Sequence, residues 1–323
     1  MRVVVGAVAA TAGLVVAACG TPAAAPVTPA DITPLQASAR AVRVRPTATG
    51  TTLGGCPVFP ADNAWNTDVS QAPVRAGSAA TIGHFGGNLH PDFGSNPDYG
   101  IPFVIVPADQ VPVPVTFDAY GNQSDPGPYP IPLNAPVEAG SDAHVLALQQ
   151  GTCLLYELFA ASAGNGGWTA ASGARWDLRS NALRPEGWTS ADAAGLPILP
   201  GLLRYDEVAS GQVTHAIRMT FSETYAGHIH PATHDASSLT DPTLPPMGLR
   251  LRLRADFDVS RYTGAARVIL VAMQRYGVIV ADNGSNWFFG GATDPRWDDD
   301  DLDQLKGVPG SAFEVVETGP VIT

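Results

Sequence analysis

Histidines gather in one short stretch of the sequence. His228, His230 and His234 have the spacing His-x-His-x3-His, and with His215 they make four of the seven histidines. Imidazole is the commonest neutral ligand for zinc, copper or iron. Because alternate residues of an extended strand share a face, a His-x-His pair presents both rings together. The spacing therefore indicates a metal site formed by His228, His230 and His234.

The same spacing resembles the first metal motif of the cupins, which has Glu where His234 stands. The second cupin motif, with its spaced Gly, Pro and His, is absent downstream. The alternative is a polar loop in which one histidine orients its neighbour and the others are solvated. Two interpretations stay open: a cupin-like protein that binds a divalent metal, and a protein for which no cofactor is expected.

Two carboxylates lie one short connection before His215. A hairpin would place Asp206 and Glu207 beside the strand that carries His215 and Arg218. Paired carboxylates hydrolyse glycosidic bonds, whereas a base beside an arginine that neutralises a uronate suits a polysaccharide lyase. The alternative is that the carboxylates are turn residues paired with a surface arginine. We take Asp206, Glu207, His215 and His234 as candidate catalytic residues.

Aromatic and polar side chains suited to sugars occur in two further segments. Trp176 is followed by Asp177, and Trp287 ends a run of Asp and Asn residues that begins at Asp282. CH groups of a sugar pack on such rings while its hydroxyls meet the polar side chains. Core packing is the competing explanation for each tryptophan. With Arg218, Trp176, Trp287 and Asp282 are candidate substrate-binding residues.

The elements that must position these residues are mainly strands. Pro and Gly are frequent and evenly spread, and they separate short runs rich in Val, Ile, Leu, Phe and Tyr. Strands are expected at residues 101–106, 113–119, 144–149, 152–160, 213–221, 248–257, 277–281 and 313–317. Helical signals are few, at residues 190–194, 264–276 and 298–305. The pattern predicts an all-β fold, a β-sandwich of jelly-roll type with one or two short helices.

Strict alternation marks the strand at residues 248–257. Leu251 and Leu253 would face the core, while Arg250, Arg252 and Arg254 would face outward. A row of arginines on one sheet surface could form the wall of a groove. Arg250 and Arg252 are therefore further candidates for binding substrate.

The N-terminal region predicts export. Residues 1–18 combine a short basic start, an apolar run and small residues before Cys19, which is the pattern of a lipoprotein signal peptide. Acylation of Cys19, by palmitate or a similar chain, would anchor the protein to a membrane. Residues 19–54, rich in Ala, Pro and Thr, read as a disordered tether, and residues 55–323 as a single β-sandwich domain. An ordinary secretory peptide is the alternative, and it also implies an extracytoplasmic protein.

Two cysteines remain beyond the predicted tether. In an oxidising compartment Cys56 and Cys153 are expected to form a disulfide. The formal net charge of −12 argues against nucleic acid as a partner, because that partner requires a basic surface.

Three segments, at residues 124–132, 181–197 and 204–208, resemble an uncharacterised family of secreted bacterial proteins, and the resemblance covers most of residues 56–317. That family shares the Pro-Ala-x-His step ending at His234, but it has aromatic residues at the positions of His228 and His230. The difference weakens the metal interpretation and favours His234 and His215. Beyond the family, the layout is similar in kind to jelly-roll and concanavalin-like glycanases.

The sequence thus predicts an exported, lipid-anchored, carbohydrate-active enzyme that cleaves a polysaccharide or cell-surface glycan, by hydrolysis or by elimination. Its contact with the membrane would be through the Cys19 lipid alone. The alternatives are a non-catalytic surface lipoprotein that binds glycan or protein, and a cupin-like metal-dependent protein.

Overall fold

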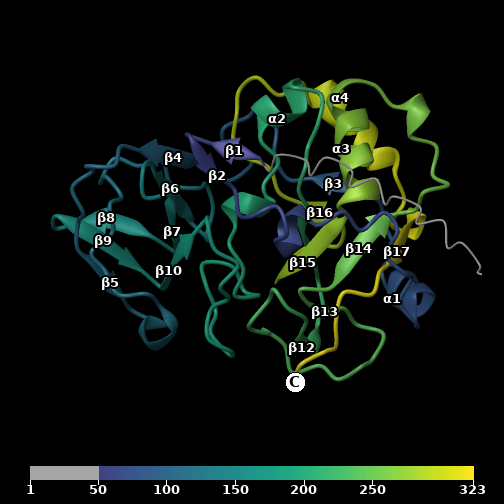
Figure 1. The fold of residues 1–323 in the computed structure, drawn as a ribbon, viewed down its shortest axis with the longest axis horizontal. Helices are drawn as coiled ribbons and strands as arrows, with labels where there is room; N and C mark the ends of the chain where they lie inside the picture. Colours follow the sequence, from purple (N-terminus) through teal and green to yellow (C-terminus); the bar gives the residue numbers. More distant parts are fainter. Residues whose placement is uncertain (1–50) are drawn as a thin grey trace, which may run out of the picture. The chain divides into compact units, whose positions relative to one another are not determined.

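The largest sheet has six strands in the order β17-β14-β15-β11-β16-β3 in the computed structural model, which describes residues 51–323 (Figure 1). These strands are β3 (His90–Pro91), β11 (Ile217–Phe221), β14 (Arg250–Leu253), β15 (Val278–Asn283), β16 (Phe288–Phe289) and β17 (Phe313–Val315). Helix α3 (Gly264–Arg275) packs on β14 and on α4 (Asp299–Asp303). Apolar residues on one side of α3, including Ile269 and Met273, are fully buried, which fixes this helix against the sheet.

A four-stranded sheet has the order β10-β7-β6-β4, and its strand β6 is buried on both faces. Its strands are β4 (Phe103–Val106), β6 (Val145–Gln149), β7 (Leu154–Phe159) and β10 (Ser172–Asp177). Leu146 and Leu148 face the main core, whereas Val145 and Ala147 face a second apolar cluster. Because alternate residues of β6 point to opposite faces of the sheet, this one strand contributes side chains to both apolar clusters. The sheet β5-β9-β8, with β5 (Val115–Phe117), β8 (Ser162–Gly164) and β9 (Gly167–Ala170), covers the second cluster.

Shorter elements complete the described residues. The remaining strands are β1 (Thr52–Leu53), β2 (Cys56–Pro57), β12 (Tyr225–His228) and β13 (Pro246–Met247). The remaining α-helices are α1 (Ser78–His84) and α2 (Tyr205–Ala209). Six 3-10 turns lie at η1 (Ala64–Asn66), η2 (Gly121–Gln123), η3 (Leu199–Gly201), η4 (Val259–Arg261), η5 (Gln304–Gly307) and η6 (Gly310–Ala312) within residues 51–323.

The β-rich character predicted from the sequence is confirmed. The jelly-roll arrangement is not confirmed, because parallel pairs such as β11–β15 and β4–β6 lie within both main sheets, whereas a jelly roll is built from antiparallel Greek keys. Strands occur in each segment where they were expected, and in most of these segments they are shorter than predicted.

The helix expectations had mixed outcomes. Helix α3 ends before Gly277, whose positive φ of 68° suits a helix C-terminus, as predicted. Residues 190–194 form an irregular turn instead of a helix. The Ser190 hydroxyl accepts the N–H of Asp192, but Gly195 and Pro197 follow before a helix can develop. The hairpin expected around Asp206 is the short helix α2.

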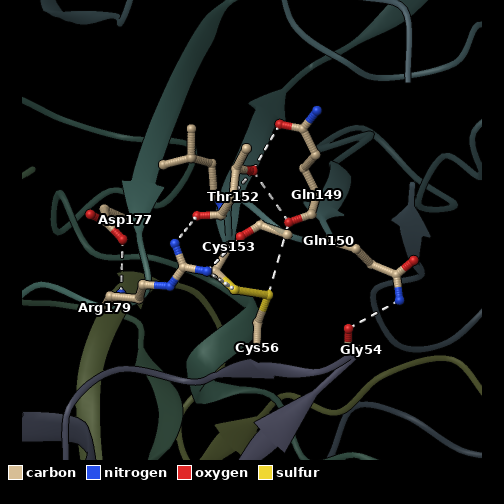
Figure 2. The surroundings of a disulfide bond; sticks show 10 residues. Gly54, Cys56, Gln149, Gln150, Thr152, Cys153, Asp177 and Arg179 are labelled. Carbon is tan, nitrogen blue, oxygen red and sulfur yellow. Dashed lines mark hydrogen bonds between the residues drawn. A yellow bond between two sulfur atoms is a disulfide. The ribbon is translucent and has the colours of Figure 1, made fainter. Parts of the chain in front are cut away.

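The predicted disulfide between Cys56 and Cys153 is present, with their Cα atoms 5.4 Å apart. Figure 2 shows Arg179 beside it, donating to the carbonyl of Thr152 at 2.9 Å and lying 3.2 Å from the Cys153 sulfur. The bridge joins β2 to the turn between β6 and β7. Closing a loop of this length is worth roughly 4–5 kcal/mol at most in the chain-entropy account.

The predicted orientation of Arg250 and Arg252 was wrong, because both side chains are buried. Arg250 donates to the carbonyls of Tyr276 and Ala64, and Arg252 donates to Glu314 at 2.8 Å. The chain around residues 64–69 covers this face of β14, so these arginines do not form the exposed row that was predicted.

The signal peptide, Cys19 and nearly all of the predicted tether lie outside the described residues. Strand β1 falls within the predicted tether and pairs with β2. Across residues 51–323, none of the helices has the length and apolar character needed to span a bilayer.

Candidate functional site

A small pocket of about 200 Å³ brings two of the predicted site residues together. Asp282 comes from the C-terminal part of β15, and His234 comes from the loop that follows β12. Asp192, from the irregular segment between β10 and η3, lines the same pocket. Tyr120 and Phe159 supply aromatic surface. We call this pocket the Asp192–Asp282 site.

The segment around Asp192 is held at successive residues. The carbonyl of Ala191 accepts from His144 Nε2 at 3.0 Å, and the carbonyl of Ala193 accepts from His234 Nδ1 at 2.7 Å. The N–H of Ala194 donates to Ala281 beside Asp282. These bonds replace the helix that the sequence predicted, and they fix the position of the segment against β15.

Asp192 and Arg218 form a buried ion pair behind the pocket. Two of the three guanidinium nitrogens of Arg218 donate to Asp192, Nη2 to Oδ1 at 2.8 Å and Nε to Oδ2 at 3.1 Å. Asp192 is 1% exposed, so its charge depends on this fork for compensation. Arg218 lies on β11, which pairs with β15.

Asp282 shares the same arginine from a longer distance. Its Oδ2 lies 3.6 Å from Arg218 Nη2, and its Oδ1 accepts the N–H of Asn283 at 2.7 Å. Burial, together with the negative charge of Asp192, raises the pKa of Asp282 to about 7, although Arg218 opposes the shift. Asp282 is therefore about half protonated near pH 7.

His144 and Glu138 extend the charged network. His144 Nδ1 lies 2.5 Å from Glu138 Oε2, and its Nε2 faces a carbonyl. Both neighbours are acceptors, so both ring nitrogens carry protons when both bonds are made. Burial by itself would lower the pKa of His144, but the hydrogen bond and charge of Glu138 outweigh it and raise the pKa. The protonated His144 ring adds a positive charge near Asp192 and Asp282.

The ring of His234 is held through its Nδ1 atom. Its Nδ1–H donates to the Ala193 carbonyl, which leaves the lone pair on Nε2. Among residues 51–323, no hydrogen-bond partner of Nε2 is found. Backbone bonds from Thr233 and His234 to the Ala194 carbonyl hold the ring beside the pocket.

Two of the other predicted catalytic residues, Asp206 and Glu207, border a different cavity, of about 650 Å³, and the third, His215, contacts Glu207. Glu207 is paired with Arg204 and lies 3.3 Å from His215 Nε2. Burial would raise the pKa of Glu207, but the charges of Arg204 and His215 outweigh it and lower the pKa to about 2. His215 is fully buried, and its Nδ1 donates to Ala216. We call Arg204, Glu207 and His215 the Glu207 cluster.

Asp206 lies beside the Glu207 cluster but points to solvent. Its side chain is 81% exposed and pairs with Arg296 at 2.8 Å. Thus the structure places Asp206, Glu207 and His215 near one cavity and His234 at another.

The two predicted tryptophan platforms are covered. Trp287 is fully buried and donates to the Phe85 carbonyl at 3.4 Å. Trp176 is buried beside Arg184, and its Nε1 donates to Glu157 at 3.1 Å. Neither ring offers a free face to a sugar, so these two substrate-binding assignments are corrected.

The histidine motif divides between two places. His228 and His230 both contact Glu186, which the sequence analysis did not single out, whereas His234 lines the Asp192–Asp282 site. The predicted trio is therefore not a single ligand set among the described residues. Glu186 and Asp192 were both missed because each belongs to irregular chain whose partners are distant in sequence.

Comparison with known proteins gave no match to a family model, to a curated protein or to a solved structure.

Proposed function

We propose that the protein is a carbohydrate-active hydrolase whose acid–base chemistry takes place in the Asp192–Asp282 site. The observation that carries the proposal is the sharing of Arg218 by Asp192 and Asp282. Burial and the negative charge of Asp192 raise the pKa of Asp282 to about 7, and the same pocket contains His234 with a lone pair on Nε2. Acid–base catalysis requires a proton donor and a proton acceptor in the same pocket, and Asp282 and His234 are suited to these two roles.

Each group has a defined role in the proposed reaction. Asp282 gives its proton to the glycosidic oxygen as the bond to the anomeric carbon breaks. Water attacks that carbon and passes a proton to His234 Nε2. The products are a free reducing end and an alcohol, and exchange with solvent returns the proton to Asp282. Asp192 keeps Arg218 in place and does not act as the nucleophile, because its oxygens accept the arginine fork.

The environment favours hydrolysis over elimination. A lyase requires a cation free to neutralise a uronate, but Arg218 is buried and engaged by Asp192. Tyr120 and Phe159 give aromatic surface beside polar groups, which suits a sugar ring. The volume of about 200 Å³ lies below the roughly 300 Å³ typical of larger ligands, so it fits a single ring.

The proposal also includes export and anchoring through Cys19. The Cys56–Cys153 disulfide supports an oxidising compartment, where such bonds persist.

The test is a panel of neutral and uronate glycans incubated with the purified chain. Reducing ends would report hydrolysis, and an ultraviolet-absorbing unsaturated product would report elimination. We expect reducing ends from at least one glycan, and a loss of roughly 10²- to 10⁴-fold in kcat for Asp282→Asn and for His234→Gln. Asp206→Asn is the matched control and keeps full activity.

The pH profile adds a second readout. Because Asp282 must be protonated to act as the acid, kcat should fall as pH rises above about 7. Absence of cleavage on every glycan would overturn the proposal, as would an Asp206→Asn variant that loses as much activity as Asp282→Asn.

Non-catalytic glycan binding is the second candidate. It is favoured by the complete pairing of Asp192 with Arg218, which leaves one carboxylate without a chemical role. If the wild-type protein bound a glycan without cleaving it, this candidate would replace the hydrolase.

A further inference from the structure

Two histidines and a glutamate converge outside the proposed catalytic pocket. Glu186 Oε2 lies 2.9 Å from His228 Nε2, and Glu186 Oε1 lies 2.5 Å from His230 Nε2. The ligand atoms of the three residues all lie within 4.8 Å of one another. Two imidazoles and a carboxylate are a donor set for divalent transition metals.

The backbone on both sides of this cluster is fixed. His228, at the end of β12, exchanges two backbone hydrogen bonds with Ile322, at 2.9 and 2.8 Å. The loop that carries Glu186 is tied to the histidine loop by the N–H of Gly187, which donates to the Thr233 carbonyl at 2.7 Å. Three ligands are therefore held near one point before any ion binds, which reduces the cost of ordering them.

The ring of His228 is not satisfied by the protein alone. The side chain is buried, and its Nδ1 has no hydrogen-bond partner among residues 51–323. Buried polar atoms of this kind are uncommon in folded proteins. The atom that faces Glu186 is Nε2, so Nε2 would bind the ion, and Nδ1 lies outside the ligand set.

The separations suit a metal of the size of zinc. Bonds of about 2.0–2.1 Å in a tetrahedral site place neighbouring ligand atoms roughly 3.4 Å apart. The present contacts of 2.5 and 2.9 Å would have to open by less than an ångström, which side-chain rotation allows for the exposed Glu186 and His230.

The geometry points to a binding site for one zinc-class divalent cation formed by Glu186, His228 and His230. Three protein ligands leave a coordination position open, as in catalytic rather than structural zinc sites. His230 also borders a cavity of about 460 Å³ that includes Asp62 and Arg250, so there is space for a small ligand beside this cluster. The ion is independent of the chemistry proposed for Asp282.

Zinc itself is the probe for the test. Calorimetric titration would use the purified chain carrying Cys19→Ser, because Cys56 and Cys153 are bridged and Cys19 is the one other cysteine of the sequence. We expect one Zn²⁺ per chain and a rise in Tm on binding. Glu186→Gln and His230→Gln should each weaken the affinity by at least about tenfold and reduce the rise in Tm at a fixed zinc concentration.

The matched control is a second histidine–glutamate pair. His84 Nε2 lies 3.6 Å from Glu223 in a partly exposed position, but no second histidine joins it in the described part of the chain. Glu223→Gln should bind zinc like the parent. The proposal is overturned by a parent chain that takes up no stoichiometric zinc, or by Glu223→Gln losing as much affinity as Glu186→Gln.

Discussion

Two regions of the molecule combine arginine, carboxylate and histidine, yet they shift a carboxyl pKa in opposite directions. In the Glu207 cluster, one carboxylate faces Arg204 and His215, and the pKa of Glu207 falls to about 2. In the Asp192–Asp282 site, two carboxylates share Arg218, and the pKa of Asp282 rises to about 7. Burial raises the pKa of both carboxyl groups, and the neighbouring positive charges reverse the shift only at Glu207.

The larger of the two cavities is not the one whose carboxyl group titrates near neutral pH. The Glu207 cluster borders the larger cavity, of about 650 Å³, and the Asp192–Asp282 site the smaller one, of about 200 Å³. Glu207 is ionised throughout the neutral range and engaged by its partners, so it is suited to holding structure. Asp282 can gain and lose a proton near pH 7, and this is the property that a catalytic acid needs.

The largest effect is expected from Arg218→Met. It removes the cation that compensates Asp192, which is 1% exposed, and it leaves a buried unpaired charge. We expect the free energy of unfolding at neutral pH to fall by roughly 3–5 kcal/mol. Urea denaturation followed by tryptophan fluorescence would measure it, with Arg296→Met, at an exposed arginine, as the control. Equal midpoints for the two variants would contradict the prediction.

Asp282→Asn should stabilise the protein at high pH. Because the folded-state pKa of Asp282 is raised from the ordinary 3.8 to about 7, the wild type loses stability as pH rises between these values. The difference corresponds to at most roughly 4 kcal/mol. Denaturation curves at pH 8 should show the variant as the more stable protein, and curves near pH 3 should coincide. A variant less stable than wild type at pH 8 would remove the assigned pKa.

Glu207→Gln should have the opposite pH signature. The folded-state pKa of Glu207 lies below the ordinary 4.5, so its contribution is present above pH 4.5 and is lost as pH falls toward about 2. The variant should lose roughly 3 kcal/mol at pH 7 and nothing near pH 2. The same denaturation series measures it. If the deficit persisted unchanged at the acid end, the loss would come from packing instead of charge.

The smallest effect is expected from Asp206→Asn. Asp206 belongs to an exposed pair with Arg296, where water and salt screen the attraction. Thermal unfolding at low and high salt should give the same Tm as wild type within error. A clear loss of stability would show that the border of the larger cavity depends on charge more than its exposure indicates.

The periodicity of apolar residues predicted where helices and strands lie better than it predicted which of their faces are buried. The spacing of apolar residues located α3, and Gly277 marked its end. The alternation that placed Arg250 and Arg252 outward assumed that one sheet face meets water, but the chain near Ala64 and Val69 covers that face. Whether a strand is covered on one face or both depends on distant segments, and a local pattern cannot contain that information.

The sequence identified single residues of the Asp192–Asp282 site, but it did not show which residues meet there. His234 and Asp282 were recognised by type, but their meeting depends on Asp192, which lies in a turn that was expected to be helical. Ala191 and Ala193 act through main-chain carbonyls, which every residue possesses, so no side-chain pattern reveals them. Glu186 was missed for a different reason, because its partners lie over forty residues later.

The three consecutive residues from Ala191 to Ala193 connect separate layers of the protein. His144 directly precedes β6 of the four-stranded sheet, Arg218 lies on β11 of the six-stranded sheet, and His234 belongs to the loop after β12. Any sliding of the four-stranded sheet past the six-stranded sheet would therefore strain the hydrogen bond from His144 to Ala191 or the ion pair of Arg218 with Asp192, and would disturb the segment that lines the pocket. A molecule lodged there would resist that shear, so occupancy should slow amide hydrogen exchange in strands of both sheets together.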